Sequence, residues 1–173
     1  MSADGDRPAA ARRPGALRIG NGYDSHRFDA ACDLVLGGVR IPGHAGLAGH
    51  SDGDAVAHAV IDAVLGAAAA GDVGSYFPPS DPRWKGADSI ELLTLAAHAM
   101  RQVGWRVVNV DVTVVCESPK VRPHAEAMCR RLADGLGVLP DQVSVKGKTN
   151  EGMGWIGAGE GVAVHAVALI EAV

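Results

Sequence analysis

Residues 107–115, with the sequence VVNVDVTVV, form the clearest strand pattern in the chain and set its fold class. Polar side chains at positions 109, 111 and 113 alternate with valines at 108, 110, 112 and 114, so one face of this strand is expected to be apolar. Further strands are predicted at residues 17–19, 34–36, 39–41, 143–145 and 162–169. Gly37-Gly38 is the predicted turn of a hairpin, and Gly20-Asn21-Gly22 is predicted to bend the chain after its first strand.

Three helices are predicted beside this sheet, at residues 52–70, 88–104 and 123–137. In the first helix the apolar residues recur every three or four positions, and Ser51 or Asp52 would be its N-cap. Pro123 suits the first turn of the third helix, which Gly137 is expected to end. Because the elements alternate without regular βαβ repeats, the prediction is an α+β fold with a mixed β-sheet covered on one face by helices.

Length and charge limit the classes of function. A chain of 173 residues fits one domain, predicted at residues 17–173, after a disordered N-terminal tail at residues 1–16. The net charge of −4 argues against nucleic acid as a partner, and no apolar run predicts a membrane span or a secretory signal, so a cytoplasmic protein is expected. Cys32, Cys116 and Cys129 include no C-x-x-C pair and are predicted to be reduced and mostly buried.

A metal site is predicted from two separate stretches. Asp24 and His26 are two residues apart, so in extended chain their side chains project to the same side. Asp54, His58 and Asp62 lie four apart on one line of the first helix, which has no Lys or Glu from 54 to 70, so this line is expected to face a site. Asp24, His26 and His58 would bind zinc and leave its fourth position open, with Asp54 or Asp62 orienting His58.

A phosphate site is predicted in Lys146-Gly147-Lys148-Thr149-Asn150-Glu151-Gly152, directly after a strand. Its cations, hydroxyl and backbone N–H groups could bind phosphate oxygens, although the residue order is not that of a Walker A loop. A polar turn is the alternative explanation. The remaining histidines lie in predicted helices, strands or loops without such partners and are set aside; they are His44, His98, His124 and His165.

Together these residues resemble the family of 2-C-methyl-D-erythritol 2,4-cyclodiphosphate synthases, from Arg18 to Leu169. The matching stretches occur in the family's order: Gly20-x-Gly22-x-Asp24-x-His26, His50-Ser51-Asp52-Gly53-Asp54 with His58, Gly71-Asp72-Val73-Gly74 with Phe77-Pro78, Ser118-Pro119-Lys120, Lys146 with Thr149-x-Glu151, and Gly159-Glu160-Gly161.

The resemblance implies a lyase of isoprenoid precursor synthesis that closes a cyclic diphosphate and releases CMP from a cytidine diphosphate substrate. It implies Zn²⁺ on Asp24, His26 and His58, and a second divalent ion, Mg²⁺ or Mn²⁺, near Glu151. His50 and Thr149 would stabilise the transition state. The substrate-binding residues would be Ser51, Asp72, Gly74, Phe77, Asp81, Cys116, Lys120, Arg122, Lys148 and Trp155. Family members are homotrimers whose sheets surround a central cavity and whose active sites lie between neighbours.

The sequence departs from the family pattern at several positions. Pro79 stands where an aspartate is common, Lys148 and Asn150 replace threonines, and Ala158 stands where arginine is common. Because that arginine binds an isoprenoid diphosphate in relatives, such regulation is not expected here. Two other functions remain open: a metal-dependent phosphohydrolase that uses the same zinc position to activate water, and a trimeric protein in which zinc only clamps strand to helix.

Overall fold

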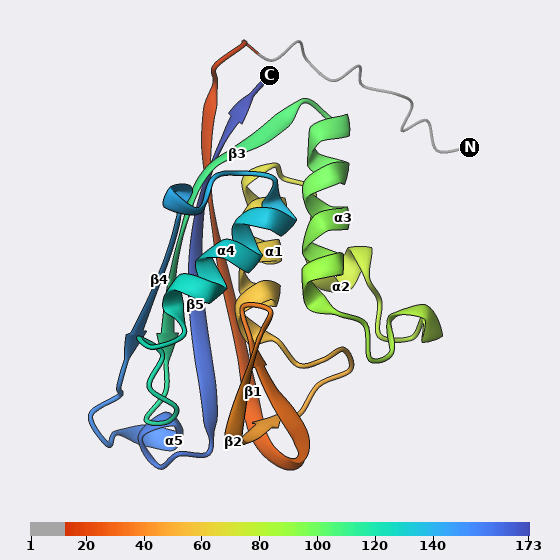
Figure 1. Cartoon of the computed structure of the whole chain (residues 1–173). Helices are drawn as coiled ribbons and strands as arrows, with labels where there is room; N and C mark the ends of the chain where they lie inside the picture. The colour runs from red at the N-terminus through yellow and green to blue at the C-terminus, as the bar shows by residue number, and fades with distance from the viewer. Residues whose placement is uncertain (1–12) are drawn as a thin grey trace.

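The computed structural model of the chain describes residues 13–173 (Figure 1). Most of the predicted tail, residues 1–12, lies outside the described residues. Residues 13–16 form a turn that is joined to the end of the last strand, because the Gly15 N–H donates to the Ala172 carbonyl over 3.0 Å. The rest of the chain folds around one sheet.

The five-stranded sheet has the order β2-β1-β5-β3-β4. Its strands are β1 (Leu17–Leu36), β2 (Val39–Leu47), β3 (Trp105–Val115), β4 (Val143–Lys148) and β5 (Gly161–Ala172). The β3–β4 pair is parallel, whereas the other three pairs are antiparallel. The predicted mixed sheet and the hairpin at Gly37-Gly38 are confirmed, the latter by the pairing of Leu36 with Val39.

Three long helices lie on the same side of this sheet (Figure 1). The helical elements are α1 (Ala55–Ala67), α2 (Val73–Tyr76), η1 (Pro82–Trp84), α3 (Ser89–Gln102), α4 (Ala125–Leu136), η2 (Pro140–Gln142) and α5 (Gly154–Gly157). The core lies between these helices and the sheet, where Val110, Val112 and Val114 of β3 are buried. The predicted α+β class, with helices covering one face of the sheet, is therefore confirmed.

The glycines of β1 do not form the predicted bend. Gly20 and Gly22 lie within a continuous strand and pair with Ala168 and Ala166 of β5. A Cβ at either glycine would lie 1.9 Å from a carbonyl oxygen of α1, that of Ala63 for Gly20 and that of Ala59 for Gly22. These residues are therefore glycine because the helix backbone approaches the strand closely. From the sequence alone, two nearby glycines can indicate either a turn or such a close approach.

Three further local predictions are corrected. Helix α1 is capped by Asp54, and neither Ser51 nor Asp52 is its cap; helix α4 begins after Pro123, with His124 at the N-cap position. In β3 the alternation shifts between Val107 and Asn109, so Val107 is buried and Val108 is only half-buried. Such an irregularity changes the face to which side chains point, and a strictly alternating pattern does not reveal it. The predicted end of α4 at Gly137 is confirmed, with φ +67°.

The face of the sheet without helices carries exposed apolar side chains. The most exposed are Leu17, Ile19 and Tyr23 on β1 and Val167 on β5. Ile19 is exposed to 73%, which is unusual for a large aliphatic residue in the middle of paired strands. No helix within residues 13–173 is both long and apolar enough to cross a bilayer.

Candidate metal centre and active site

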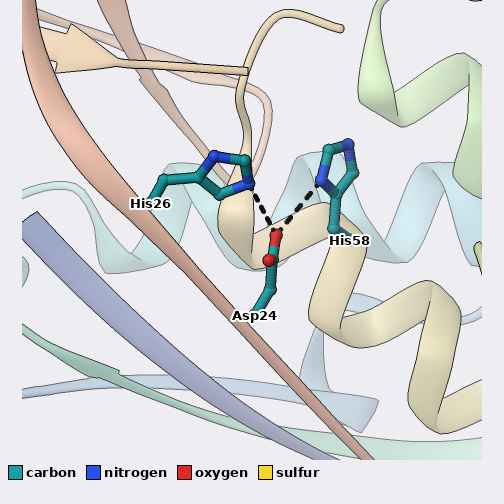
Figure 2. Close-up of side chains that lie close together, drawn as sticks. All are labelled: Asp24, His26 and His58. Atoms are coloured by element: carbon teal, nitrogen blue, oxygen red, sulfur yellow. Dashed lines mark hydrogen bonds and ion pairs between the residues drawn. The ribbon is translucent and has the colours of Figure 1, made fainter. Parts of the chain in front are cut away.

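The metal centre forms where β1 and α1 separate after the two glycine contacts. Asp24 and His26 follow Gly20 and Gly22 with the period of a strand, so all four face α1. His58 projects from the first turn of α1 toward the same point (Figure 2). Asp24 Oδ2 lies 2.9 Å from His26 Nε2 and 3.1 Å from His58 Nδ1. One ligand atom from each of the three residues lies within 4.8 Å of the other two.

Backbone contact sets the tautomer of His26. Its Nδ1 donates a hydrogen bond to the carbonyl of Ala48, the residue that follows β2. In a neutral imidazole the other nitrogen, Nε2, then carries a lone pair and points at the cluster. A ligand nitrogen held in this way by a carbonyl on its far side is typical of metal-binding histidines.

His58 is oriented by two serines: Ser51, which the sequence predicts as substrate-binding, and Ser89, which sequence reasoning missed. Its Nε2 lies 3.0 Å from the hydroxyl oxygens of Ser51 and Ser89. Ser89 in turn donates its hydroxyl proton to Asp52 Oδ1 and its N–H to Asp52 Oδ2. The Ser89 oxygen therefore accepts from His58 Nε2–H, which leaves Nδ1 unprotonated and facing Asp24. Ser89 lies in the first turn of α3. No local sequence pattern identifies a residue that orients a side chain of another helix.

The predicted line of Asp54, His58 and Asp62 does not face one site. Asp54 is completely buried and accepts hydrogen bonds from the N–H groups of Val56 and Ala57 and from those of the turn glycines Gly37 and Gly38. Asp62 Oδ1 accepts the N–H of Val73 over 2.7 Å. Neither carboxylate orients His58, because each is committed to backbone donors of another segment.

The charges of the cluster favour a bound cation. Burial raises the pKa of Asp24, but the hydrogen bonds that His26 and His58 donate to it when their rings are protonated outweigh burial and hold this pKa well below its ordinary value. The hydrogen bond to Asp24 raises the pKa of His26 against the effect of burial. Asp24 is therefore an ionised carboxylate between two imidazoles whose side chains are 16% and 13% exposed.

This donor set fits a zinc ion. It offers two nitrogens and one carboxylate oxygen, each imidazole is held through its other nitrogen, and the three residues border an open cavity. A structural zinc site would instead be closed by four protein ligands. Within residues 13–173, the only group of at least three close His, Cys, Asp or Glu ligands is this one.

The cavity beside the cluster contains several predicted substrate-binding residues. Its volume is about 280 Å³, and the residues around it come from β1, the loop between β2 and α1, α1, the segment between α1 and α3, and α3 itself. Its lining residues are Asp24, His26, His50, Ser51, His58, Val73, Gly74, Phe77, Pro79, Trp84 and Leu92. The structure therefore brings His50, Ser51, Gly74 and Phe77 to the metal cluster. Trp84, which sequence reasoning missed, meets Phe77 edge to face with ring centroids 5.1 Å apart.

Two predicted substrate-binding carboxylates, Asp72 and Asp81, do not line this cavity. Asp72 caps α2 by accepting the N–H and hydroxyl of Ser75, and these bonds lower its pKa. Asp81 caps η1 and pairs with Arg83, whose hydrogen bond lowers the pKa of this carboxyl. Both residues shape the segment that carries Gly74 and Phe77. The N–H of Gly86 at the end of this segment donates to the carbonyl of His50.

A second cavity, of about 130 Å³, lies at the ends of β3 and β4 and shares no lining residue with the first. It gathers four of the predicted substrate-binding residues, Cys116, Lys120, Arg122 and Lys148, with Thr149. The other lining residues are Pro119, Val121 and Gly147. Burial raises the pKa of the Cys116 thiol to about 11, so this thiol is neutral near pH 7. Cys32, by contrast, is exposed, so the prediction of mostly buried thiols is wrong for it.

The remaining predicted residues lie around these cavities. Lys146 pairs with Asp111 on the neighbouring strand, so its ammonium group is engaged outside the second cavity. Glu151 lies in the turn after β4 and accepts the hydroxyl proton of Thr149 over 2.9 Å. Trp155 of α5 borders a third cavity, of about 370 Å³, together with His26 and Glu160.

Comparisons with known proteins agree with this arrangement. A family model described as the YgbB family matches residues 17–171. The chain is 54% identical over 156 residues to the 2-C-methyl-D-erythritol 2,4-cyclodiphosphate synthase of Pseudomonas aeruginosa. The aligned stretch covers 90% of this chain and 99% of that relative.

Two solved structures are similar throughout most of the chain. The bifunctional IspDF from Campylobacter jejuni superposes with a TM-score of 0.88 and 38% identity over 92% of this chain, which spans only 43% of that protein. A 2C-methyl-D-erythritol-2,4-cyclodiphosphate synthase in a form bound to CDP has a TM-score of 0.81 and 36% identity, covering 89% of this chain and all of that one. The chain therefore belongs to the YgbB family, that of the 2-C-methyl-D-erythritol 2,4-cyclodiphosphate synthases.

Proposed function

We propose that this chain converts 4-diphosphocytidyl-2-C-methyl-D-erythritol 2-phosphate to 2-C-methyl-D-erythritol 2,4-cyclodiphosphate and CMP, on the non-mevalonate route to isoprenoid precursors. The observation that carries the proposal is the cluster of Asp24, His26 and His58 at the wall of a cavity. The name of the Pseudomonas relative, at 54% identity over 90% of the chain, supports the same activity.

The reaction exchanges one phosphorus–oxygen bond for another. An oxygen of the 2-phosphate forms a bond to the β-phosphorus, the bond from that phosphorus to the bridging oxygen breaks, and its electron pair leaves with CMP. No protein atom becomes covalently attached, so the task of the protein is to hold two anionic groups in line and to offset their repulsion. Such a reaction makes the enzyme a phosphorus–oxygen lyase.

The residues of the chain fit the two cations that this task needs. Asp24, His26 and His58 would hold zinc, and Glu151 would hold a second divalent ion, Mg²⁺ or Mn²⁺, together with substrate oxygens. When bound, the ions supply positive charge to the phosphate oxygens. The far-side contacts of the two imidazoles, to Ala48 and Ser89, keep the ligand nitrogens directed at one point.

The methylerythritol part of the substrate would lie in the cavity beside the zinc ligands. Ser51, Gly74 and Phe77 line this cavity, whereas Asp72 and Asp81 would act on the sugar from the turns that they cap. His50, in the same wall, and Thr149, in the second cavity, would stabilise the transition state.

The cytidine nucleotide would occupy the cavity at the ends of β3 and β4. A neutral Cys116 thiol forms part of its wall, and Lys120, Arg122 and Lys148 place three cations around it. Cationic side chains are suited to phosphate oxygens. Trp155, from α5, would complete the substrate-binding set. A relative solved in a CDP-bound form supports a cytidine nucleotide as ligand.

A homotrimer would unite these separate cavities. The zinc and nucleotide cavities share no lining residue within one chain, so a neighbouring chain can supply the nucleotide side of each site. The exposed apolar side chains of the helix-free sheet face, among them Ile19 and Val167, are suited to packing against neighbours around a central cavity.

The experiment that tests this function is incubation of the purified, zinc-loaded protein with the cytidylated 2-phosphate substrate and Mg²⁺, followed by phosphorus NMR. We expect equal amounts of CMP and the cyclic diphosphate. Hydrolysis to a linear product would contradict the proposal and favour a phosphohydrolase, whereas no turnover with stably bound zinc would favour a structural metal site. Native mass spectrometry of the same sample should show three chains.

A further inference from the structure

Glu117 joins the nucleotide cavity to the turn that carries Glu151. The parallel pairing of β3 and β4 continues one residue past the end of β3, because the Cys116 N–H donates to the carbonyl of Lys148, the last residue of β4, over 3.0 Å. Glu117, the next residue, is therefore beside the start of the turn after β4. Cys116 and Lys148 themselves line the second cavity, so Glu117 directly follows a residue of its wall.

The side chain of Glu117 is bonded to that turn and not to a cation. Its Oε1 accepts the backbone N–H of Asn150 over 2.9 Å and that of Gly152 over 3.3 Å. These two donors flank Glu151 in the sequence. One half-buried carboxylate oxygen thus holds the main chain on both sides of the predicted ligand of the second ion. A charged acceptor makes stronger bonds to N–H groups than a neutral one.

The turn needs such an external contact because its backbone is strained. The Met153 N–H donates to the Asn150 carbonyl, and the two central residues, Glu151 and Gly152, have φ values of +52° and +73°. A turn with two central residues in the left-handed region favours Gly, Asn and Asp there, and a glutamate in this region carries a steric cost. Strained residues of this kind persist where the surroundings hold them and often serve a site.

We propose that Glu117 is a positioning residue that holds the strained turn, so that Glu151 and Thr149 face the substrate phosphates. This inference rests on the proposed role of Glu151 as ligand of the second divalent ion. Without Glu117 the turn relaxes, the Thr149–Glu151 hydrogen bond is no longer held in place, and the ion loses its protein ligand. The zinc centre, which is built from β1 and α1, is unaffected.

The test compares three variants of Glu117 with a control in the intact protein. Glu117→Ala removes the acceptor, and Glu117→Asp keeps the charge but shortens the side chain, so that one oxygen cannot reach both amides. Glu117→Gln keeps an acceptor oxygen at the same reach and should restore most of the contact. Glu126→Ala is the control, because Glu126 is an exposed residue of α4 that pairs with Arg130 one turn along the same helix.

Two readouts are needed besides activity. Amide hydrogen exchange should become at least about 10-fold faster at Asn150 and Gly152 in the Ala and Asp variants, since each loses an N–H acceptor. Binding of Mn²⁺ to the CDP-bound protein, measured by electron paramagnetic resonance, should weaken about 10-fold in the same variants, with unchanged zinc content. In both readouts the Gln variant should be close to the wild type, and the Glu126→Ala control should be equal to the wild type.

Each outcome decides one part of the inference. Unchanged exchange at Asn150 and Gly152 in both the Ala and the Asp variant would overturn the positioning role. Faster exchange with unchanged Mn²⁺ affinity would overturn the link to the second ion. If the wild-type protein binds no Mn²⁺ beside CDP, the proposed role of Glu151 fails, while the exchange data still decide whether Glu117 holds the turn. Should Glu117→Ala not fold, Glu117→Asp provides the same readouts.

Discussion

At the metal centre, Asp24 and His26 come from a regular strand and His58 from a regular helix, whereas Thr149 and Glu151 come from a turn between β4 and α5. The first region is fixed by a sheet ladder and by the close approach of α1 to Gly20 and Gly22. The second has an exposed glutamate at positive φ, and it is held by one backbone hydrogen bond, from the Met153 N–H to the Asn150 carbonyl, and by side-chain contacts.

This difference indicates which part of the site already has its binding geometry before the substrate binds. Groups on packed strands and helices are held by many buried contacts, so the zinc ligands are expected to be preorganised. Groups on a turn that depends on a few hydrogen bonds open more easily and become ordered as ligands bind. Variants that change one of these regions and leave the other intact test the difference between them.

Replacement of His58 tests the metal centre most directly. His58→Ala should abolish stoichiometric zinc binding and lower turnover more than about 100-fold, because it removes one of three ligands. The helix should remain, since alanine is a good helix former. Zinc is measured by elemental analysis and folding by circular dichroism. The control is His98→Ala, an exposed position on α3; retention of a full zinc equivalent by His58→Ala would refute the ligand set.

A change at Gly22 tests the frame of the metal centre. In Gly22→Ala the new Cβ would lie 1.9 Å from the Ala59 carbonyl oxygen, so strand and helix must separate, at a cost of about 3 kcal/mol in the free energy of unfolding. Gly66→Ala is the matched control on α1, where the nearest atom lies 3.9 Å away, and it should stabilise the helix by about 0.5–1 kcal/mol. Denaturant unfolding measures both. Equal stability of the two variants would show that close packing does not build this region.

Replacement of Asp62, which accepts the Val73 N–H, tests the wall of the cavity proposed to hold the methylerythritol part of the substrate. Asp62→Ala frees the Val73 N–H, so the segment with Gly74 and Phe77 should loosen and KM should rise about 10-fold, with a smaller change in kcat and unchanged zinc. In Asp62→Asn the amide oxygen can still accept this N–H and should restore most of the affinity. Steady-state kinetics separate the two parameters. A fall in kcat alone would assign Asp62 to the chemical step and not to positioning.

Lys148 tests the nucleotide side with the smallest expected effect. Lys148→Met removes one of three cations around the second cavity and should weaken CDP binding about 3- to 5-fold at low salt, because an exposed charge contributes little. High salt should narrow the difference from the wild type. The exposed residue Lys85, outside this cavity, gives the control Lys85→Met. Titration calorimetry measures the affinity; loss of zinc on replacing Lys148 would contradict the separation of the two regions.

Much of the fold and site was predictable because the signals are local. Alternation in residues 107–115 indicates a half-buried strand, Gly37-Gly38 a hairpin turn, and Gly137 the end of a helix at a left-handed residue. The period of two between Asp24 and His26 placed both on one face of extended chain, and the structure brings His58 to them.

Local sequence patterns identify the types of element, the hairpin and the ligand types of the candidate metal centre, and the ordered motifs identify the family. The folded chain adds four contacts that these patterns do not contain: the approach of a helix to Gly20 and Gly22, the bonds of Asp54 to the Gly37-Gly38 turn, the orientation of His58 by Ser89, and the bonds of Glu117 around Glu151. The physical reason is that each of these roles depends on a partner at least 16 residues away, and a short-range pattern carries no record of what the folded chain places beside it.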